Sequence, residues 1–127
     1  MIDLHAHTRF SDGSLTPTEL VQLAVGEGLS AVAVTDHDSI GGLEEALDAG
    51  ERLGIEVVPG VELNLEHHQV TLDLLGYFFD CCPGDETEAE LETLRGYRYE
   101  RNARILERLA EMGMPIAQET LDAIAED

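Results

Sequence analysis

The chain has 127 residues, 43% of them hydrophobic, and a formal net charge of -20, because 27 acidic residues outnumber seven arginines and there is no lysine. This length predicts one domain with its own core. So acidic a surface repels a phosphate backbone, which argues against long nucleic acid as a partner. A phosphorylated substrate would need local attraction from metal ions or from well-placed arginines.

Neither a membrane span nor a leader segment is predicted. No apolar run approaches the roughly 20 residues that cross a bilayer. The chain opens with an apolar stretch that lacks a basic flank and a small-residue cleavage site, so we expect a cytoplasmic protein. Cys81 and Cys82 are adjacent, a spacing that fits neither a redox pair nor a zinc knuckle, and we interpret them as thiols near a turn.

The first predicted elements are a strand and a capped helix. Residues 2–6 form a short apolar strand, with Ile2 and Leu4 expected in the core. A capping box follows, with Thr16 as N-cap and Glu19 at the third helical position. The side of this helix expected to be buried carries Leu20, Val21, Leu23 and Ala24, and the helix should end near Gly26 or Gly28.

The next segments alternate in the same way. The stretch "AVAVTDHD" predicts a strand buried on both faces. A second helix should open at Gly41-Gly42 and close at Gly54. Residues 55–64 predict a third strand, interrupted at Pro59-Gly60, and residues 70–79 a fourth. The order β-α-β-α-β-β predicts an α/β fold with parallel units, whose ligands gather at the carboxyl ends of the strands.

The composition changes near residue 84. Acidic residues crowd the start of a long helical pattern, where they suit the helix dipole, and arginines follow. Residues 118–125 predict one more short helix. We therefore expect an α/β part at residues 1–84 and an all-helical part at residues 85–127.

Residues with metal-ligand chemistry follow three successive strands. His5 and His7 are two apart on a strand, so their imidazoles share a face. Asp12 lies in the turn sequence "SDG", and His37 and Glu62 come from the ends of the next two strands. Each motif alone is commonly incidental, and "TDHD" is also compatible with a helix cap at Asp38. Together they predict a site for zinc, manganese or iron.

These motifs resemble a known family. "DLHAHTRFSDGSLTPTELV", "AVAVTDHDSIGGLEEA" and "VVPGVELN" are similar to the first three motifs of the PHP (polymerase and histidinol phosphatase) superfamily, and "LLGYFFD" resembles the fourth. The similarity is greatest to the small bacterial metal-dependent phosphoesterases and extends over essentially the whole chain. It implies the N-terminal part of a distorted (β/α)7 barrel followed by an all-helical insertion segment.

The resemblance also implies a function. Phosphoester bonds of nucleotides or short oligonucleotides would be hydrolysed by water that divalent metals activate, with up to about three ions of Mn, Zn, Fe or Mg. The implied metal ligands are His5, His7, Asp12, His37 and Glu62. Glu62 and His37 are also implied in catalysis, and Glu62 would bridge two metals.

The chain departs from the family pattern in two ways. The position of a usual histidine ligand holds Asp73, which either ligates harder cations such as Mn²⁺ or Mg²⁺ or weakens that metal site. His67 and His68 lie nearby and could substitute, although exposed loop histidines are the simpler interpretation. The resemblance also implies a second half of the barrel beyond residue 127. We therefore expect the chain alone to be poorly active and to self-associate.

The long helix places arginines unusually. On a continuous helix over residues 88–112, Arg98 falls inside the apolar stripe and Arg101 beside it. Either the two guanidinium groups bind a substrate phosphate, or they extend to solvent or pair with helix glutamates. Two other functions remain open: an amidohydrolase-like metal hydrolase, and a non-catalytic or degenerate PHP metal-binding module.

Overall fold

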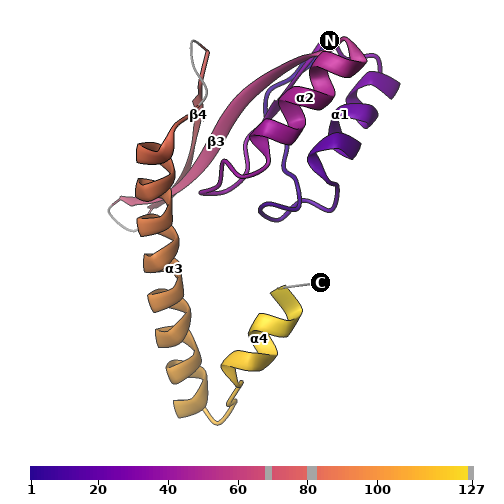
Figure 1. The fold of residues 1–127 in the computed structure, drawn as a ribbon. Coiled ribbons are helices and arrows are strands. Elements are labelled where there is room, and N and C mark those ends of the chain that lie inside the picture. The colour runs from indigo at the N-terminus through magenta and orange to yellow at the C-terminus, as the bar shows by residue number, and fades with distance from the viewer. Residues whose placement is uncertain (68–69, 80–82, 126–127) are drawn as a thin grey trace. The chain divides into compact units, whose positions relative to one another are not determined.

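The structure is a computed structural model that describes residues 1–67, 70–79 and 83–125 (Figure 1). Its helices and strands are β1 (Ile2–Asp3), α1 (Pro17–Gly26), β2 (Ala31–Val34), α2 (Leu43–Leu53), β3 (Glu56–His67), β4 (Val70–Tyr77), α3 (Asp85–Glu111) and α4 (Gln118–Ala125). The chain divides into two compact units, Met1–Leu91 and Glu92–Asp127. The start of α3 thus belongs to the first unit, whereas we predicted a boundary near residue 84.

The first unit is built on a four-stranded sheet with the order β1-β2-β3-β4. The first three strands are parallel, and β4 returns antiparallel to β3. Parallel neighbours require crossover connections, and α1 and α2 supply them. The predicted α/β fold class is confirmed: parallel β-α-β units form part of a (β/α) barrel, and a helical segment follows.

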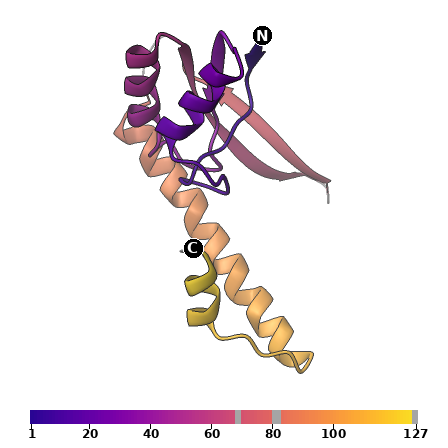
Figure 2. The same ribbon diagram turned by 90° about the vertical axis from the view of Figure 1, so that its right-hand side faces the viewer.

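Helices α1 and α2 lie side by side on one face of the sheet (Figures 1 and 2). The predicted capping box is present: the Glu19 N–H donates to Thr16 Oγ1, and the Thr16 N–H donates to the Glu19 carboxylate. The buried core between sheet and helices consists of Val21, Ala24, Val32, Val34, Leu43, Ala46, Ala49 and Ile55. Leu23 was expected in this core but is 51% exposed.

Strand β1 is shorter and less covered than expected. Only Ile2 and Asp3 pair with β2. Ile2 is 58% exposed and Leu4 40% exposed, so the prediction that they anchor the strand in the core is wrong. The physical reason is that β1 is an edge strand, which has a neighbouring strand on one side only.

Strand β3 does not break at Pro59-Gly60, contrary to the prediction. Parallel pairing with β2 ends at Pro59, which lies beside Val34, and antiparallel pairing with β4 begins at Gly60. Proline lacks an N–H for a ladder, so it is tolerated where a strand changes partner.

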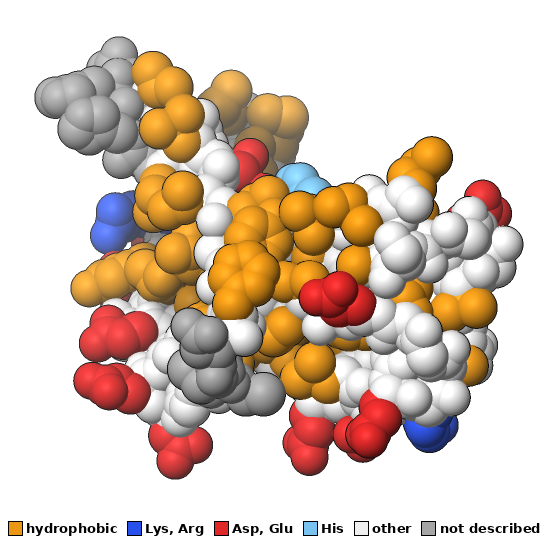
Figure 3. Space-filling view, turned by 90° about the horizontal axis from the view of Figure 1, so that it is seen from above, with side chains coloured by type: hydrophobic (Ala, Val, Ile, Leu, Met, Phe, Trp, Pro, Cys, Tyr) orange, Lys and Arg blue, Asp and Glu red, His pale blue; other side chains and the backbone are white. Residues whose placement is uncertain are grey.

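The hairpin of β3 and β4 leaves apolar side chains at the surface. Exposed fractions between 39% and 55% are found for Leu65, Val70, Leu72 and Leu74. Figure 3 shows apolar side chains over much of one face of the molecule, with acidic side chains around them.

The second unit contains most of α3 and all of α4. Helix α3 is continuous, as predicted, and α4 begins and ends at the predicted residues. No residue described between 92 and 124 is buried, and Ile105 of the predicted apolar stripe is 47% exposed. Within the described part of the chain, no helix is both long enough and apolar enough to span a membrane.

Candidate metal site

The backbone brings the ends of three parallel strands together. His5 and His7 follow β1, His37 follows β2, and Glu62 lies in β3. His37 and Glu62 form a parallel bridge, in which the Glu62 N–H donates to Asp36 O at 3.1 Å and the Asp38 N–H donates to Glu62 O at 2.9 Å. The side chains of these strand ends therefore converge, as expected for a parallel sheet.

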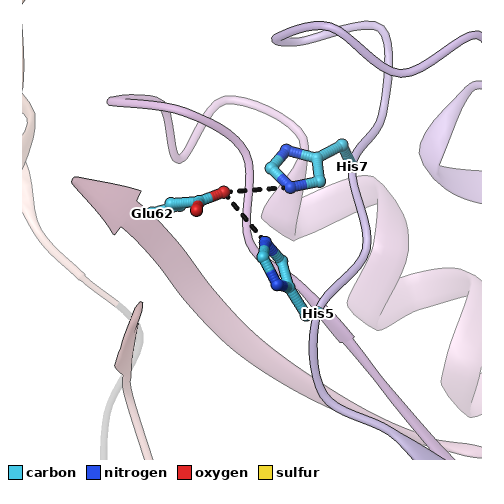
Figure 4. Close-up of side chains that lie close together, drawn as sticks. All are labelled: His5, His7 and Glu62. Carbon is cyan, nitrogen blue, oxygen red and sulfur yellow. Dashed lines mark hydrogen bonds and ion pairs between the residues drawn. The ribbon is translucent and has the colours of Figure 1, made fainter. Parts of the chain in front are cut away.

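One buried carboxylate oxygen lies at the centre of the cluster. Glu62 is 3% exposed, and its Oε2 lies 2.9 Å from His5 Nε2 and 3.0 Å from His7 Nε2 (Figure 4). The same oxygen is 3.6 Å from His37 Nδ1. Three imidazoles from two strand ends thus meet a single carboxylate.

Asp12 joins the cluster from the loop after β1. Its Oδ1 lies 3.2 Å from His7 Nδ1, and its Oδ2 lies 3.6 Å from His37 Nε2. Two groups of potential ligands result, His5–His7–Glu62 and His7–Asp12–His37, each with ligand atoms within 4.8 Å of one another. The shared His7 makes the two groups contiguous.

The loop that carries Asp12 is fixed by the buried carboxylate of Asp36, which is 1% exposed. Asp36 accepts hydrogen bonds from the Thr8 N–H at 2.6 Å, the Thr8 hydroxyl at 2.7 Å and the Ser11 hydroxyl at 2.8 Å. Gly13 lets the loop turn tightly, because a Cβ there would lie 2.3 Å from the carbonyl oxygen of His7. Asp36 therefore positions the loop beside the histidines.

The residues of this cluster fit a divalent cation. Imidazole nitrogens and carboxylate oxygens are the donors that zinc, manganese and iron take. His37 Nδ1 is buried and has no hydrogen-bond partner among the described residues, which is costly for a buried polar atom and is relieved when it binds a cation. The cluster can hold a divalent metal ion.

Other predicted site residues lie elsewhere. Asp73 is paired across the hairpin with Asn64, whose Nδ2 donates to Asp73 Oδ1 at 2.6 Å, and it is not among the ligand groups found in the described residues. Arg98 and Arg101 lie on α3 within the second unit. His68, Cys81, Cys82 and the side chain of His67 lie outside the described residues.

Sequence reasoning assigned no role to Asp36, Thr8 or Ser11. Their signal was weak but present. Asp36 comes two residues after a strand that is buried along its whole length, so its carboxylate is expected to be buried and to need hydrogen-bond partners. The polar residues of "HTRFSDG" are the natural donors for it.

Comparison with known proteins agrees with this geometry. The PHP domain family matches residues 3–112. A 5'-3' exoribonuclease of Haemophilus influenzae is 36% identical over 98% of this chain and 45% of its own length. A 3',5'-nucleoside bisphosphate phosphatase of Chromobacterium violaceum is 42% identical over 79% of this chain and 35% of its own length. The chain thus spans less than half the length of these relatives.

Two solved structures share the fold. A structure from Bifidobacterium adolescentis, assigned to the metal-dependent phosphoesterases, superimposes with a TM-score of 0.82 at 32% identity, covering 99% of this chain and 43% of that one. An amidohydrolase from Chromobacterium violaceum, with bound sulfate and no metal, gives a TM-score of 0.77 at 37% identity, covering 91% and 40%.

Proposed function

The chain belongs to the PHP domain family, and from that membership we propose that it forms the metal-binding part of a phosphoesterase acting on nucleotides or short oligonucleotides. The observation that carries the proposal is the meeting of His5, His7 and His37 at the buried Glu62 carboxylate.

Six residues hold the cations in this proposal. Five of them, His5, His7, Asp12, His37 and Glu62, form the two ligand groups, and the sixth is Asp73. A divalent cation, when bound, lowers the pKa of water and neutralises charge on phosphoryl oxygens. Glu62 contacts His5 and His7 through one of its two oxygens, Oε2, and would bridge two cations. The buried Nδ1 of His37 lies 3.6 Å from the same Glu62 oxygen, and His37 shares the catalytic role with Glu62.

Manganese is the metal we propose to test first, with zinc, iron and magnesium as alternatives. A complete domain would hold up to about three ions. Asp73 would be a ligand to one of them, and a carboxylate there favours harder cations.

The proposed substrates are small. The two relatives named above act, by their names, on RNA ends and on nucleoside bisphosphates. With a net charge of -20, this chain repels long polyanions, so mononucleotides and short ends are preferred. Arg98 and Arg101 are proposed to bind a substrate phosphate, because guanidinium groups bind phosphate bidentately.

The test is metal binding and phosphoester hydrolysis measured side by side. Manganese affinity is measured by calorimetry, and hydrolysis is measured on p-nitrophenyl phosphate, a nucleoside 3',5'-bisphosphate and a short RNA. Turnover that requires manganese and disappears in Glu62→Gln supports the proposal. Turnover that survives in both Glu62→Gln and His7→Ala contradicts it.

A second function is kept because one structural relative is called an amidohydrolase. A panel of amide substrates added to the same assay separates the two chemistries. Manganese binding without hydrolysis of either class, both by this chain and by a chain extended to the length of its relatives, would instead support the non-catalytic module.

A further inference from the structure

Tyr77 connects the two edges of the sheet across its concave face. It is the last residue of β4, and its hydroxyl donates to the carbonyl oxygen of Leu4 at 2.7 Å. Strands β1 and β4 are not neighbours, because β2 and β3 lie between them. In a flat sheet three strand spacings would separate them by about 14 Å. A single side chain can make this contact only because the sheet is strongly curled.

A glycine on the neighbouring strand leaves room for the Tyr77 ring. Gly60 lies opposite Tyr77 in the β3–β4 ladder. A Cβ at Gly60 would lie 3.2 Å from Tyr77 Cδ1 and 2.9 Å from Thr35 Cγ2. The ring therefore crosses β3 where no side chain stands in its way, and it passes toward β2 and β1.

The contact point on the first strand is next to a proposed ligand. Leu4 precedes His5, whose Nε2 lies 2.9 Å from Glu62 Oε2. Strand β1 ends at Asp3, and the next hydrogen bond to the neighbouring strand's extension is from the Thr35 N–H to Ala6 O at 2.9 Å, so Leu4 and His5 lie between these two held points. The His5 side chain is 49% exposed, and packing alone does not fix it.

We propose that Tyr77 is a positioning residue for the metal site, holding the segment of Leu4 and His5 at the distance from Glu62 that a cation requires. This inference rests on the proposed metal-binding role of His5 and Glu62. Tyr77 acts through the Leu4 backbone and touches neither ligand in the contacts described, so its effect should pass through His5 alone.

The experiment compares Tyr77→Phe with the wild-type chain in calorimetric titration with MnCl₂. Loss of the hydroxyl should weaken manganese binding by about tenfold, the lower end of the effect of removing a group that orients a ligand. In a His5→Ala background the same change should have no effect, because the ligand being positioned is gone. Tyr97→Phe, at a side chain 63% exposed on α3, is the matched control.

Equal affinity of Tyr77→Phe and wild type would overturn the proposal, as would an undiminished effect in the His5→Ala background. A Tyr77→Phe chain that is unfolded by circular dichroism would also overturn it, because the hydroxyl would then serve folding itself.

The result for Tyr77 can be distinguished from the result for the proposed function. A chain that binds manganese but hydrolyses no phosphoester, even when extended to the length of its relatives, contradicts the function, while the affinities still decide the role of Tyr77. A wild-type chain that binds no manganese contradicts both.

Discussion

The two compact units of this chain differ in what they bury. The first unit has a buried core between β2 and its two helices, and it contains all five convergent side chains of the candidate metal site. The second unit has no buried residue among those described. The potential metal ligands and the buried core therefore lie in the same unit, Met1–Leu91.

The contrast between α2 and α3 shows why. Both helices carry apolar residues at helical spacing. Leu43 of α2 is 4% exposed because it packs into the core with β2 and α1, whereas Ile105 of α3 is 47% exposed. Helical periodicity thus shows which face can be buried, and only a neighbouring element determines whether it is.

The largest expected effect is a test of this contrast in burial. Leu43→Ala should lower the free energy of unfolding by about 2–5 kcal/mol, since it leaves a cavity in a packed core. Ile105→Ala in the second unit should cost less than about 1 kcal/mol. Urea unfolding followed by circular dichroism measures both changes. Equal losses of unfolding free energy would show that the second unit also has a packed core.

The next effect tests whether the metal site belongs to the first unit alone. Glu62→Gln should weaken manganese binding at least about 100-fold, because even changes to groups that only orient ligands cost about 10–100-fold. The matched control is Glu92→Gln, an exposed position of the second unit. Calorimetry gives both affinities, and a comparable loss in the control would place ligands outside the cluster.

A smaller effect is expected from Asp36→Asn, which keeps the shape of the side chain. The amide cannot accept all three hydrogen bonds from Thr8 and Ser11, so about 1–3 kcal/mol of stability should be lost. Manganese affinity should fall as well, since Ser11 and Asp12 lose their anchor. Thermal unfolding and calorimetry test this, with exposed Asp48→Asn as control; unchanged affinity would show that the loop holds Asp12 without Asp36.

The smallest effect concerns an exposed feature of the same unit, the capping box of α1. The Thr16 N–H and then the Thr16 hydroxyl hold the pKa of Glu19 below its ordinary value of 4.5. A lowered pKa contributes stability that is present above pH 4.5 and lost as the pH falls through the folded-state value. The Tm difference between wild type and Glu19→Gln should therefore shrink between pH 7 and pH 3, and a constant difference would contradict this account.

Much of the fold could be predicted from the sequence because helix caps and buried strands depend on residues that are close together in the chain. The capping box at Thr16, the left-handed Gly54 that ends α2 and the buried run of β2 all formed as predicted. The predicted break at Pro59 did not, because proline was assessed without knowing that β3 exchanges one partner for another there.

The site residues could be predicted from the sequence to different degrees. His5, His7, Asp12, His37 and Glu62 lie together because parallel strands bring their carboxyl ends to one edge. The roles that we assigned to them stay predictions. The contribution of Tyr77 had no local signal, since its partner is 73 positions away and is a backbone carbonyl, which every residue possesses.

The spatial order of the strands has a consequence for biosynthesis. Because β1, β2, β3 and β4 stand in the order in which they are synthesised, each new strand can join the one made just before it as the chain leaves the ribosome. His5 is made early, and the carboxylate that it meets follows 57 positions later. The cation site is therefore completed only when β3 is in place, and until then the nascent chain carries its histidines unassembled.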